Sequence, residues 1–180
     1  MTCRAGLLGL LLLLAEGGPE ASVSNLQVAV DGQRVLASVV LRNALDGALL
    51  ARLQSGLPTP IVYRFELLRD RKRWFDRGLA STTLEVAAVY DAVTQETTVN
   101  YRLDDKLIDA RTVRDRRSLE RAMTRIEAVP VFTLEDAPRG QRLLVRARAE
   151  LGTRMVLALI PARIATAWAE SRKFRVPGAG

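Results

Sequence analysis

Two stretches near the start of the chain have an apolar residue at every second position, and Asp31-Gly32 lies between them. The alternation covers residues 26–30 before this dipeptide and residues 35–41 after it. A period of two is that of a β-strand with one buried face. Because Asp-Gly between two such runs favours a tight turn, we predict an antiparallel hairpin here.

Alternation returns later in the chain and predicts further strands at residues 61–68, 81–90, 99–103 and 142–151. A turn is expected at residues 91–97. The apolar run 154–161 fits either a buried strand or a short buried helix, because periodicity cannot separate the two. One edge strand is expected within residues 170–176, followed by a loose tail at residues 177–180.

Residues 45–53 have a different period, with a leucine at every fourth position. This spacing predicts a helix with one apolar side. Asn43 is expected to cap its start and Asp46 to lie in its first turn. Gly56 and Pro58 are expected to end it.

A second helix is predicted over residues 112–130. Thr112 with Asp115 resembles a capping box, an apolar stripe runs as far as Ile126, and Pro130 marks the expected end. The opposite side of this helix carries Arg114, Arg117, Arg121 and Arg125.

Many strands with two inserted helices and no internal repeat indicate a mainly β fold. We predict an antiparallel β-sandwich or open barrel with two inserted α-helices, formed by a single β-rich domain over residues 22–176. A parallel sheet is not expected, because helices do not alternate regularly with strands.

The first 17 residues have the layout of a secretory signal peptide. Arg4 precedes an apolar run from Ala5 to Ala15, and the small residues Ala15 and Gly17 suit a cleavage site. The run is shorter than the roughly 20 residues of a membrane-spanning helix. We therefore expect export to the periplasm or secretion, or a membrane-anchored protein if the segment is not cleaved.

Residue types exclude several kinds of chemistry. The chain has no His, and its single Cys, Cys3, lies in the predicted signal peptide. A Ser-His or Cys-His nucleophile and the usual zinc ligands are therefore absent from the exported part. No glycine-rich phosphate loop and no calcium loop is present. We expect no metal and no cofactor.

Charge is concentrated in one connecting loop and on one strand. The loop RDRKRWFDRG joins the strands at 61–68 and 81–90, and arginines alternate with apolar residues along the strand at 142–151. Arginine beside an aromatic ring suits the binding of an anionic group. We expect these features to form a basic binding face made of Arg71, Arg73, Trp74, Phe75, Asp76, Arg77, Arg142, Arg146 and Arg148.

A second interpretation makes this loop only the charged end of a hairpin. Trp74 would then be a buried anchor, and Asp70 and Asp76 would pair with Arg73 or Arg77. Exposed ion pairs of this kind contribute only about 0 to 1 kcal/mol each. In both interpretations we expect the Trp74 ring to be substantially buried.

The net charge of +7 also bears on the choice of partner. Behind a signal peptide, nucleic acid is not expected. An acidic envelope protein, another anionic envelope component or the membrane surface is a better match. We therefore predict an exported bacterial envelope protein that acts as a non-enzymatic binding or interaction module. The sequence does not indicate its oligomeric state.

Two alternatives stay open. A carboxylate-based envelope hydrolase would need two carboxylates about 5 to 9.5 Å apart, and the candidates are Glu66, Asp76, Glu85, Asp91, Asp104 and Asp105. A lipid carrier with an internal apolar cavity is also compatible, since alternating strands can enclose either packed side chains or a ligand.

Four motifs together resemble a proteobacterial family of exported proteins known as a domain of unknown function, DUF4390. They are S-G-L-P at Ser55–Pro58, R-K-R-W-F-D-R at Arg71–Arg77, Y-D-A-V-T at Tyr90–Thr94 and R-A-E-L at Arg148–Leu151. The resemblance extends over residues 23–176. It implies an exported protein with an N-terminal signal or anchor, and it implies no activity.

Overall fold

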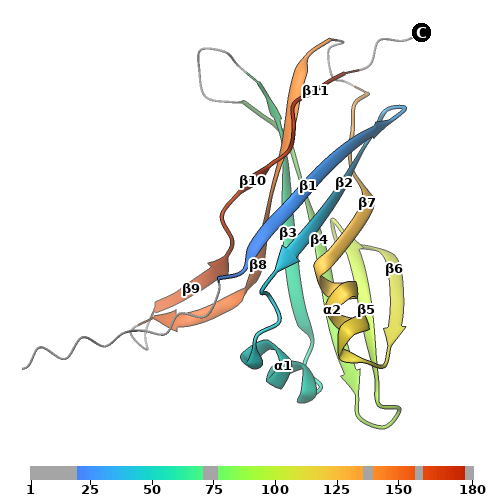
Figure 1. Cartoon of the computed structure of the whole chain (residues 1–180), viewed down its shortest axis with the longest axis vertical. Helices are drawn as coiled ribbons and strands as arrows, with labels where there is room; N and C mark the ends of the chain where they lie inside the picture. Colours follow the sequence, from blue (N-terminus) through green and yellow to red (C-terminus); the bar gives the residue numbers. More distant parts are fainter. Residues whose placement is uncertain (1–19, 71–76, 136–139, 157–159, 177–180) are drawn as a thin grey trace, which may run out of the picture.

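Two antiparallel sheets cross each other in the computed structural model, and their inner faces enclose the core (Figure 1). The structure describes residues 20–70, 77–135, 140–156 and 160–176, with residues 77, 153–156 and 160–163 described by their backbone only. The sheets leave the structure open and do not close into a barrel. This confirms the predicted mainly β fold with two helices.

The smaller sheet has three strands in the order β1-β2-β7, with bounds β1 Ser22–Asp31, β2 Arg34–Arg42 and β7 Arg125–Thr133. β1 and β2 form the predicted hairpin, in which Asp31 pairs with Arg34 across the turn. Gly32 has a φ of +57°, a left-handed conformation that glycine adopts without strain.

The larger sheet has a main path of six strands in the order β10-β8-β3-β4-β5-β6, and β9 and β11 also pair with β8. The predicted strands at 61–68, 81–90, 99–103 and 142–151 all lie in it. Their bounds are β3 Thr59–Arg69, β4 Arg77–Asp91, β5 Glu96–Leu103, β6 Lys106–Val113, β8 Arg142–Val156, β9 Ile160–Ala165, β10 Ala169–Glu170 and β11 Phe174–Arg175.

The first helix, α1, spans Gly47–Gln54, and its cap differs from the prediction. The Asp46 carboxylate accepts a hydrogen bond from the Leu49 N–H at 2.8 Å. Asn43 was the expected cap, and this was wrong. An N-cap residue needs an extended backbone, which Asp46 has, whereas Asn43 has a φ of +55°.

The second helix, α2, spans Arg116–Thr124 and is much shorter than predicted. Asp115 caps it by accepting from the Ser118 N–H at 2.9 Å, whereas Thr112 lies in β6. The chain leaves the helix after Thr124 and continues as β7, which pairs with β2. The helix was predicted to extend too far because Ile126 lies in β7 but packs into the same core as the apolar side of α2.

Strand β6 was not predicted, and its burial explains why. Seven of its eight residues are exposed and the eighth is half-buried. A strand without a buried face has no alternation of apolar and polar residues. Its position at the edge of the larger sheet is set by pairing with β5 after the turn at Asp104 and Asp105, both of which have positive φ.

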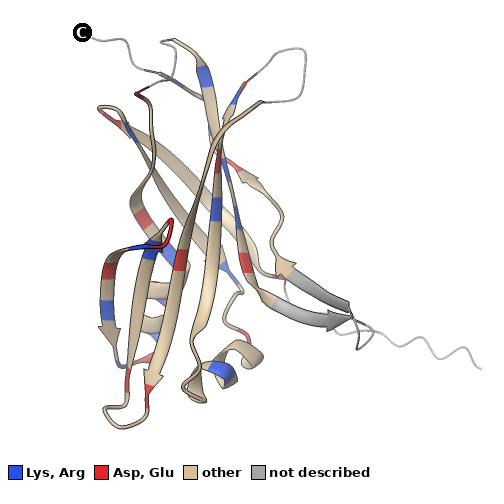
Figure 2. Ribbon diagram, turned by 180° about the vertical axis from the view of Figure 1, so that it is seen from behind, with Lys and Arg blue, Asp and Glu red and all other residues tan. Residues whose placement is uncertain are grey.

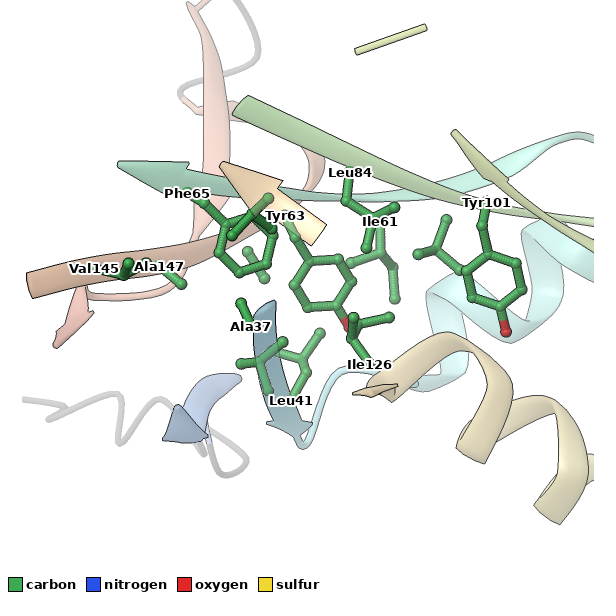
Figure 3. Close-up of a cluster of buried hydrophobic side chains, with 14 of the residues drawn as sticks. Ala37, Leu41, Ile61, Tyr63, Phe65, Leu84, Tyr101, Ile126, Val145 and Ala147 are labelled. Atoms are coloured by element: carbon green, nitrogen blue, oxygen red, sulfur yellow. The ribbon is translucent and has the colours of Figure 1, made fainter. Parts of the chain in front are cut away.

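The core lies between the two sheets (Figure 3). β3 contributes Ile61, Tyr63 and Phe65, all fully buried, and they pack with side chains from β2, β7 and β8. The inner faces are therefore those that the alternation of the sequence predicted. Neither described helix, at eight and nine residues, approaches the length of a membrane-spanning helix.

Candidate binding face on the larger sheet

The side of β3 and β8 that points away from the core carries alternating charges (Figure 2). Arg64 on β3 lies directly opposite Arg148 on β8. Like charges in this position repel each other. A shared carboxylate offsets this repulsion. Both guanidinium groups donate to Oε1 of Glu150, Arg64 through Nε at 3.4 Å and Arg148 through Nη2 at 3.0 Å.

Two residues further along each strand, the next facing pair on the same side of the sheet has opposite charges. Glu66 on β3 lies opposite Arg146 on β8. The guanidinium of Arg146 donates to Oε2 of Glu66 from both Nε, at 2.8 Å, and Nη2, at 2.6 Å. This charge-assisted pair fixes the orientation of the Arg146 side chain.

A third carboxylate lies just beyond the end of β3. Asp70 accepts from Arg142 Nε at 3.4 Å and from Lys173 Nζ at 2.8 Å. Its backbone N–H also donates to the Arg142 carbonyl at 3.0 Å. Asp70 therefore connects the end of β3 to the start of β8 and to the segment that precedes β11.

Trp168 completes the face from the C-terminal segment. β10 begins at the next residue and pairs with β8, with Ala169 opposite Ala147. This places the indole ring beside two arginines, with the guanidinium carbons of Arg146 and Arg148 at 4.5 and 4.7 Å from the ring centroid. Such cation–π contacts hold the two guanidinium planes against the ring. We use the name binding face for Arg64, Glu66, Asp70, Arg142, Arg146, Arg148, Glu150, Trp168 and Lys173.

The positive charges of the binding face are more exposed than the negative ones. Its five cations keep 31–46% of their side-chain surface exposed, whereas its three carboxylates keep 9–25%. The carboxylates lie beneath the cations and orient them. The face therefore presents positive charge to solvent even though its members are ion-paired.

The predicted basic face is only partly within the described residues. Arg142, Arg146 and Arg148 lie on one side of β8, as their alternation implied. Arg71, Arg73, Trp74, Phe75 and Asp76, and with them the predicted burial of Trp74, lie outside the described residues, and Arg77 is described by its backbone only.

The backbone still shows where the two ends of this loop lie. Arg69, at the end of β3, pairs with Arg77 of β4 on one side and with Leu143 of β8 on the other. Both ends of the loop are therefore adjacent to the start of β8, next to Arg142.

A second group of arginines lies on α2 and at the start of β7, away from the binding face. Arg116, Arg117, Arg121 and Arg125 are exposed, and no described carboxylate lies within 4 Å of them. These arginines have the same charge as those of β8, and no ion pair within 4 Å to a described carboxylate orients them, which makes them a natural control for experiments on the binding face.

Four of the candidate carboxylates for hydrolysis, Glu66, Glu85, Asp91 and Asp104, already have partners. Glu66 and Glu85 pair with Arg146 and Arg102. Backbone N–H groups of Val93 and Thr94 lower the pKa of Asp91, whereas a general acid needs a raised pKa. Asp105 lies with Asp104 in the β5–β6 turn, and Asp76 lies outside the described residues.

Two hollows lie on the open side between the sheets, where β7 faces β5. The larger, of about 390 Å³, is lined by residues from β2, β4, β5 and β7, including Arg34, and has Asp104 as its one carboxylate among the described residues. Asp104 accepts hydrogen bonds from Thr82 and Thr83. The smaller, of about 160 Å³, has the ion-paired Asp109 and Arg111 in its wall. Charged walls and open mouths do not match the enclosed apolar cavity of a lipid carrier.

The fold and the binding face define the class of protein: an open antiparallel β-sandwich with an ion-paired, outward-facing arginine cluster on its larger sheet. The chain belongs to the family described as Domain of unknown function (DUF4390), whose model matches residues 18–159. No curated protein and no solved structure matches the chain. The matched range contains both sheets up to β8, whereas Trp168 and Lys173 lie beyond it.

Sequence reasoning did not assign Trp168, Lys173, Arg64, Asp70 or Glu150 to a site. The one feature of the sequence that could have pointed to these residues is a tryptophan within a polar C-terminal segment. The ion pairs leave no local pattern in the sequence, because they join positions as far as 103 residues apart. They depend on β8 lying beside β3, which the alternation along each strand does not reveal.

Proposed function

We propose that this protein is an exported, non-enzymatic binding module of the bacterial envelope, and that its binding face contacts an acidic surface of another envelope protein. The observation that carries the proposal is the difference in exposure between cations and carboxylates on that face. Positive charge that is already oriented loses less side-chain entropy when a partner binds.

The chemistry of the face fits carboxylate groups on a partner. A guanidinium has more N–H donors than one carboxylate oxygen uses, so Arg64 and Arg148, which share Glu150, keep donors for a second acceptor. Trp168 adds a half-buried aromatic surface beside them. Arginine and tryptophan are the residue types most enriched among the strong contacts of protein interfaces.

The layout of the N-terminal segment supports an envelope location. A short positive stretch, an apolar run and small residues precede the domain. Export places the face opposite envelope proteins and lipid head groups, so an anionic lipid is the main competing partner.

The proposal is tested by titrating a fluorescent poly-glutamate peptide with the exported chain and measuring anisotropy. The double variant Arg146→Gln and Arg148→Gln removes two charges and both contacts with Trp168. The matched control, Arg116→Gln with Arg121→Gln, removes the same charge from α2. We expect the face variant to bind about tenfold more weakly or worse, which corresponds to roughly 1.4 kcal/mol, and the control to change little.

Circular dichroism and thermal unfolding establish that both variants are folded. Equal losses in the two variants would mean that binding follows net charge alone, and the proposed face would be wrong. The same titration with anionic phospholipid vesicles separates the two sources of negative charge. Loss of vesicle binding only in the face variant, with no peptide binding at all, would assign the face to lipid head groups instead of a protein.

A further inference from the structure

Strand β6 forms an unpaired edge of the larger sheet. Strands β3, β4 and β5 separate it from β8, which carries the arginines of the binding face. It pairs with β5 on one side only. Figure 1 shows it at the margin of the molecule, with no described element beyond it. Its backbone N–H and C=O groups on that margin can pair with a further strand.

The side chains of β6 are as exposed as its edge. Leu107 and Ile108 have 55% and 42% of their surface exposed, so apolar area is presented together with an open edge. Edge strands that avoid pairing are usually short, covered by another element, or protected by proline, a β-bulge or charged side chains. β6 has eight residues without proline, and no described element covers its outer edge. Its irregularity lies at Ile108, near its start, so residues 109–113 form a regular edge.

We propose that β6 pairs antiparallel with β6 of a second copy of this chain, about a two-fold axis at Ala110. The central residues D-A-R, 109–111, are complementary to themselves in this register. Asp109 faces Arg111 of the second copy, and Arg111 faces Asp109 of the second copy. Directly opposite residues lie on the same face of a sheet, so both contacts join opposite charges. This surface is separate from the binding face, and the inference does not depend on the proposed function.

The neighbouring registers of the same pair are less favourable. Moving the axis to Asp109 places two aspartates opposite each other, and moving it to Arg111 places two arginines opposite each other. Facing like charges destabilise a strand pair. An axis between Ala110 and either neighbour puts Asp109 opposite Ala110 or Thr112 and loses both charge pairs. An axis between Leu107 and Ile108 would put Lys106 opposite Asp109, but it lies at the irregular start of the strand. Within the regular part, residues 109–113, the charges therefore favour the register centred on Ala110.

The groups that would meet at the axis are already oriented. Arg111 donates from Nε to the Asp109 carboxylate at 2.9 Å, and its guanidinium carbon lies 5.0 Å from the centre of the Tyr101 ring. The hydroxyl of Tyr101 is fixed in turn by the Ala122 carbonyl. Both side chains nevertheless remain about half exposed, so they can accept partners from a second copy.

The start of β6 is not a regular strand. Its pairing with β5 is irregular at Ile108, which lies between the paired residues Leu107 and Asp109. Leu107 lies opposite Arg102, on the other face of the sheet from Asp109, Arg111 and Val113, which lie opposite Tyr101, Val99 and Thr97. The charge pairs at the axis therefore carry the proposed contact, and it does not depend on Leu107 or Ile108.

The register is tested with Ala110→Cys in a chain whose only natural cysteine has been replaced by Cys3→Ser. Cα atoms of directly opposite residues are about 4.5 to 5.5 Å apart, within the range that a disulfide spans. We expect a covalent dimer under mild oxidation in a glutathione buffer. Thr98→Cys, an exposed position on the paired strand β5, is the control and should form no covalent dimer.

Light scattering after size exclusion gives an independent readout. The unmodified chain should show twice the monomer mass, Arg111→Asp should show the monomer mass, and the swap Asp109→Arg with Arg111→Asp should restore the dimer. A monomeric unmodified chain across the concentration series, or equal cross-linking of the two cysteine variants, would overturn the proposal. So would a swap variant that stays monomeric while folded.

Discussion

Tyr63 and Tyr101 hold the end of α2 against the larger sheet. Their hydroxyl groups donate to the carbonyls of Met123 and Ala122, each at 2.8 Å. These carbonyls belong to the last turn of the helix, where no N–H within the helix is available to them. Two core residues from β3 and β5 therefore satisfy the helix end and fix where β7 begins.

Replacing Tyr63 by Phe should lower the free energy of unfolding by about 1 to 3 kcal/mol. The change leaves the Met123 carbonyl buried without a hydrogen-bond donor, and a buried unsatisfied polar group destabilises the folded state by about this amount. Urea unfolding followed by circular dichroism measures the difference. Tyr90→Phe is the matched control, since the Tyr90 hydroxyl makes no hydrogen bond with a described residue; it should change stability by less than about 0.5 kcal/mol.

The same substitution should alter stability at alkaline pH. Burial raises the pKa of Tyr63 far above its ordinary value of 10.0, and the nearby Tyr101 raises it further. The unfolded chain loses this proton first as pH rises, so stability is complete below about pH 10 and decreases above it. The Phe variant should lose stability less steeply above pH 10. Identical slopes for the two chains would show that the Tyr63 hydroxyl is not held neutral in the core.

At the scale of single elements, the sequence predicts those strands that have one buried face. Burial alternates along residues 61–67 because β3 has the core on one side and the charged face on the other. β6 could not be predicted, since both of its faces are exposed. The second helix was extended too far, because residues of α2 and β7 contribute to one continuous apolar surface that gives the same spacing along the chain.

For the binding face, the arginine stripe on β8 was predictable and its partners were not. Arg142, Arg146 and Arg148 alternate with buried residues, which places them on one side of a strand. Which carboxylates lie beside them depends on sheet order. β8 follows β3 by more than 70 residues yet pairs with it directly, and no local pattern contains that information.

The start of α1 offers a test at the level of one element. Asp46→Ala removes the acceptor for the Leu49 N–H and should lower the free energy of unfolding by about 1 kcal/mol, the usual cost of losing an N-cap. Asn43→Gly should have little effect, because Asn43 has positive φ and makes no capping bond to the helix. Thermal unfolding compares the two variants. A larger loss for Asn43→Gly would mean that the helix begins earlier than Asp46.

At the scale of the whole molecule, sheet order brings the binding face together from distant parts of the chain. β8 lies between β3 and the short strands β10 and β11. Glu66 and Asp70 therefore approach from one side, and Trp168 and Lys173 approach from the other. One C-terminal edge strand was expected, and the structure instead has two short strands, β10 and β11, separated by residues 171–173. Their contribution to the face depends on both pairing with β8.

The edge at β6 extends this arrangement beyond one chain. β8 and β6 lie near opposite margins of the larger sheet. Pairing through β6 would join two sheets into one and leave both binding faces free. Two faces in one assembly can engage a multivalent acidic partner more tightly than one face alone.

The central claim is that the binding face, and not the overall positive charge, contacts an acidic partner. Two-dimensional NMR of the ¹⁵N-labelled chain from residue 18 onward, during titration with poly-glutamate peptide, tests it most directly. We predict progressive shifts of the Trp168 indole N–H signal and of backbone amides of β3 and β8 around Arg64, Arg146 and Arg148, with little change on α2. Shifts confined to α2, or spread evenly over all exposed arginines, would contradict the account.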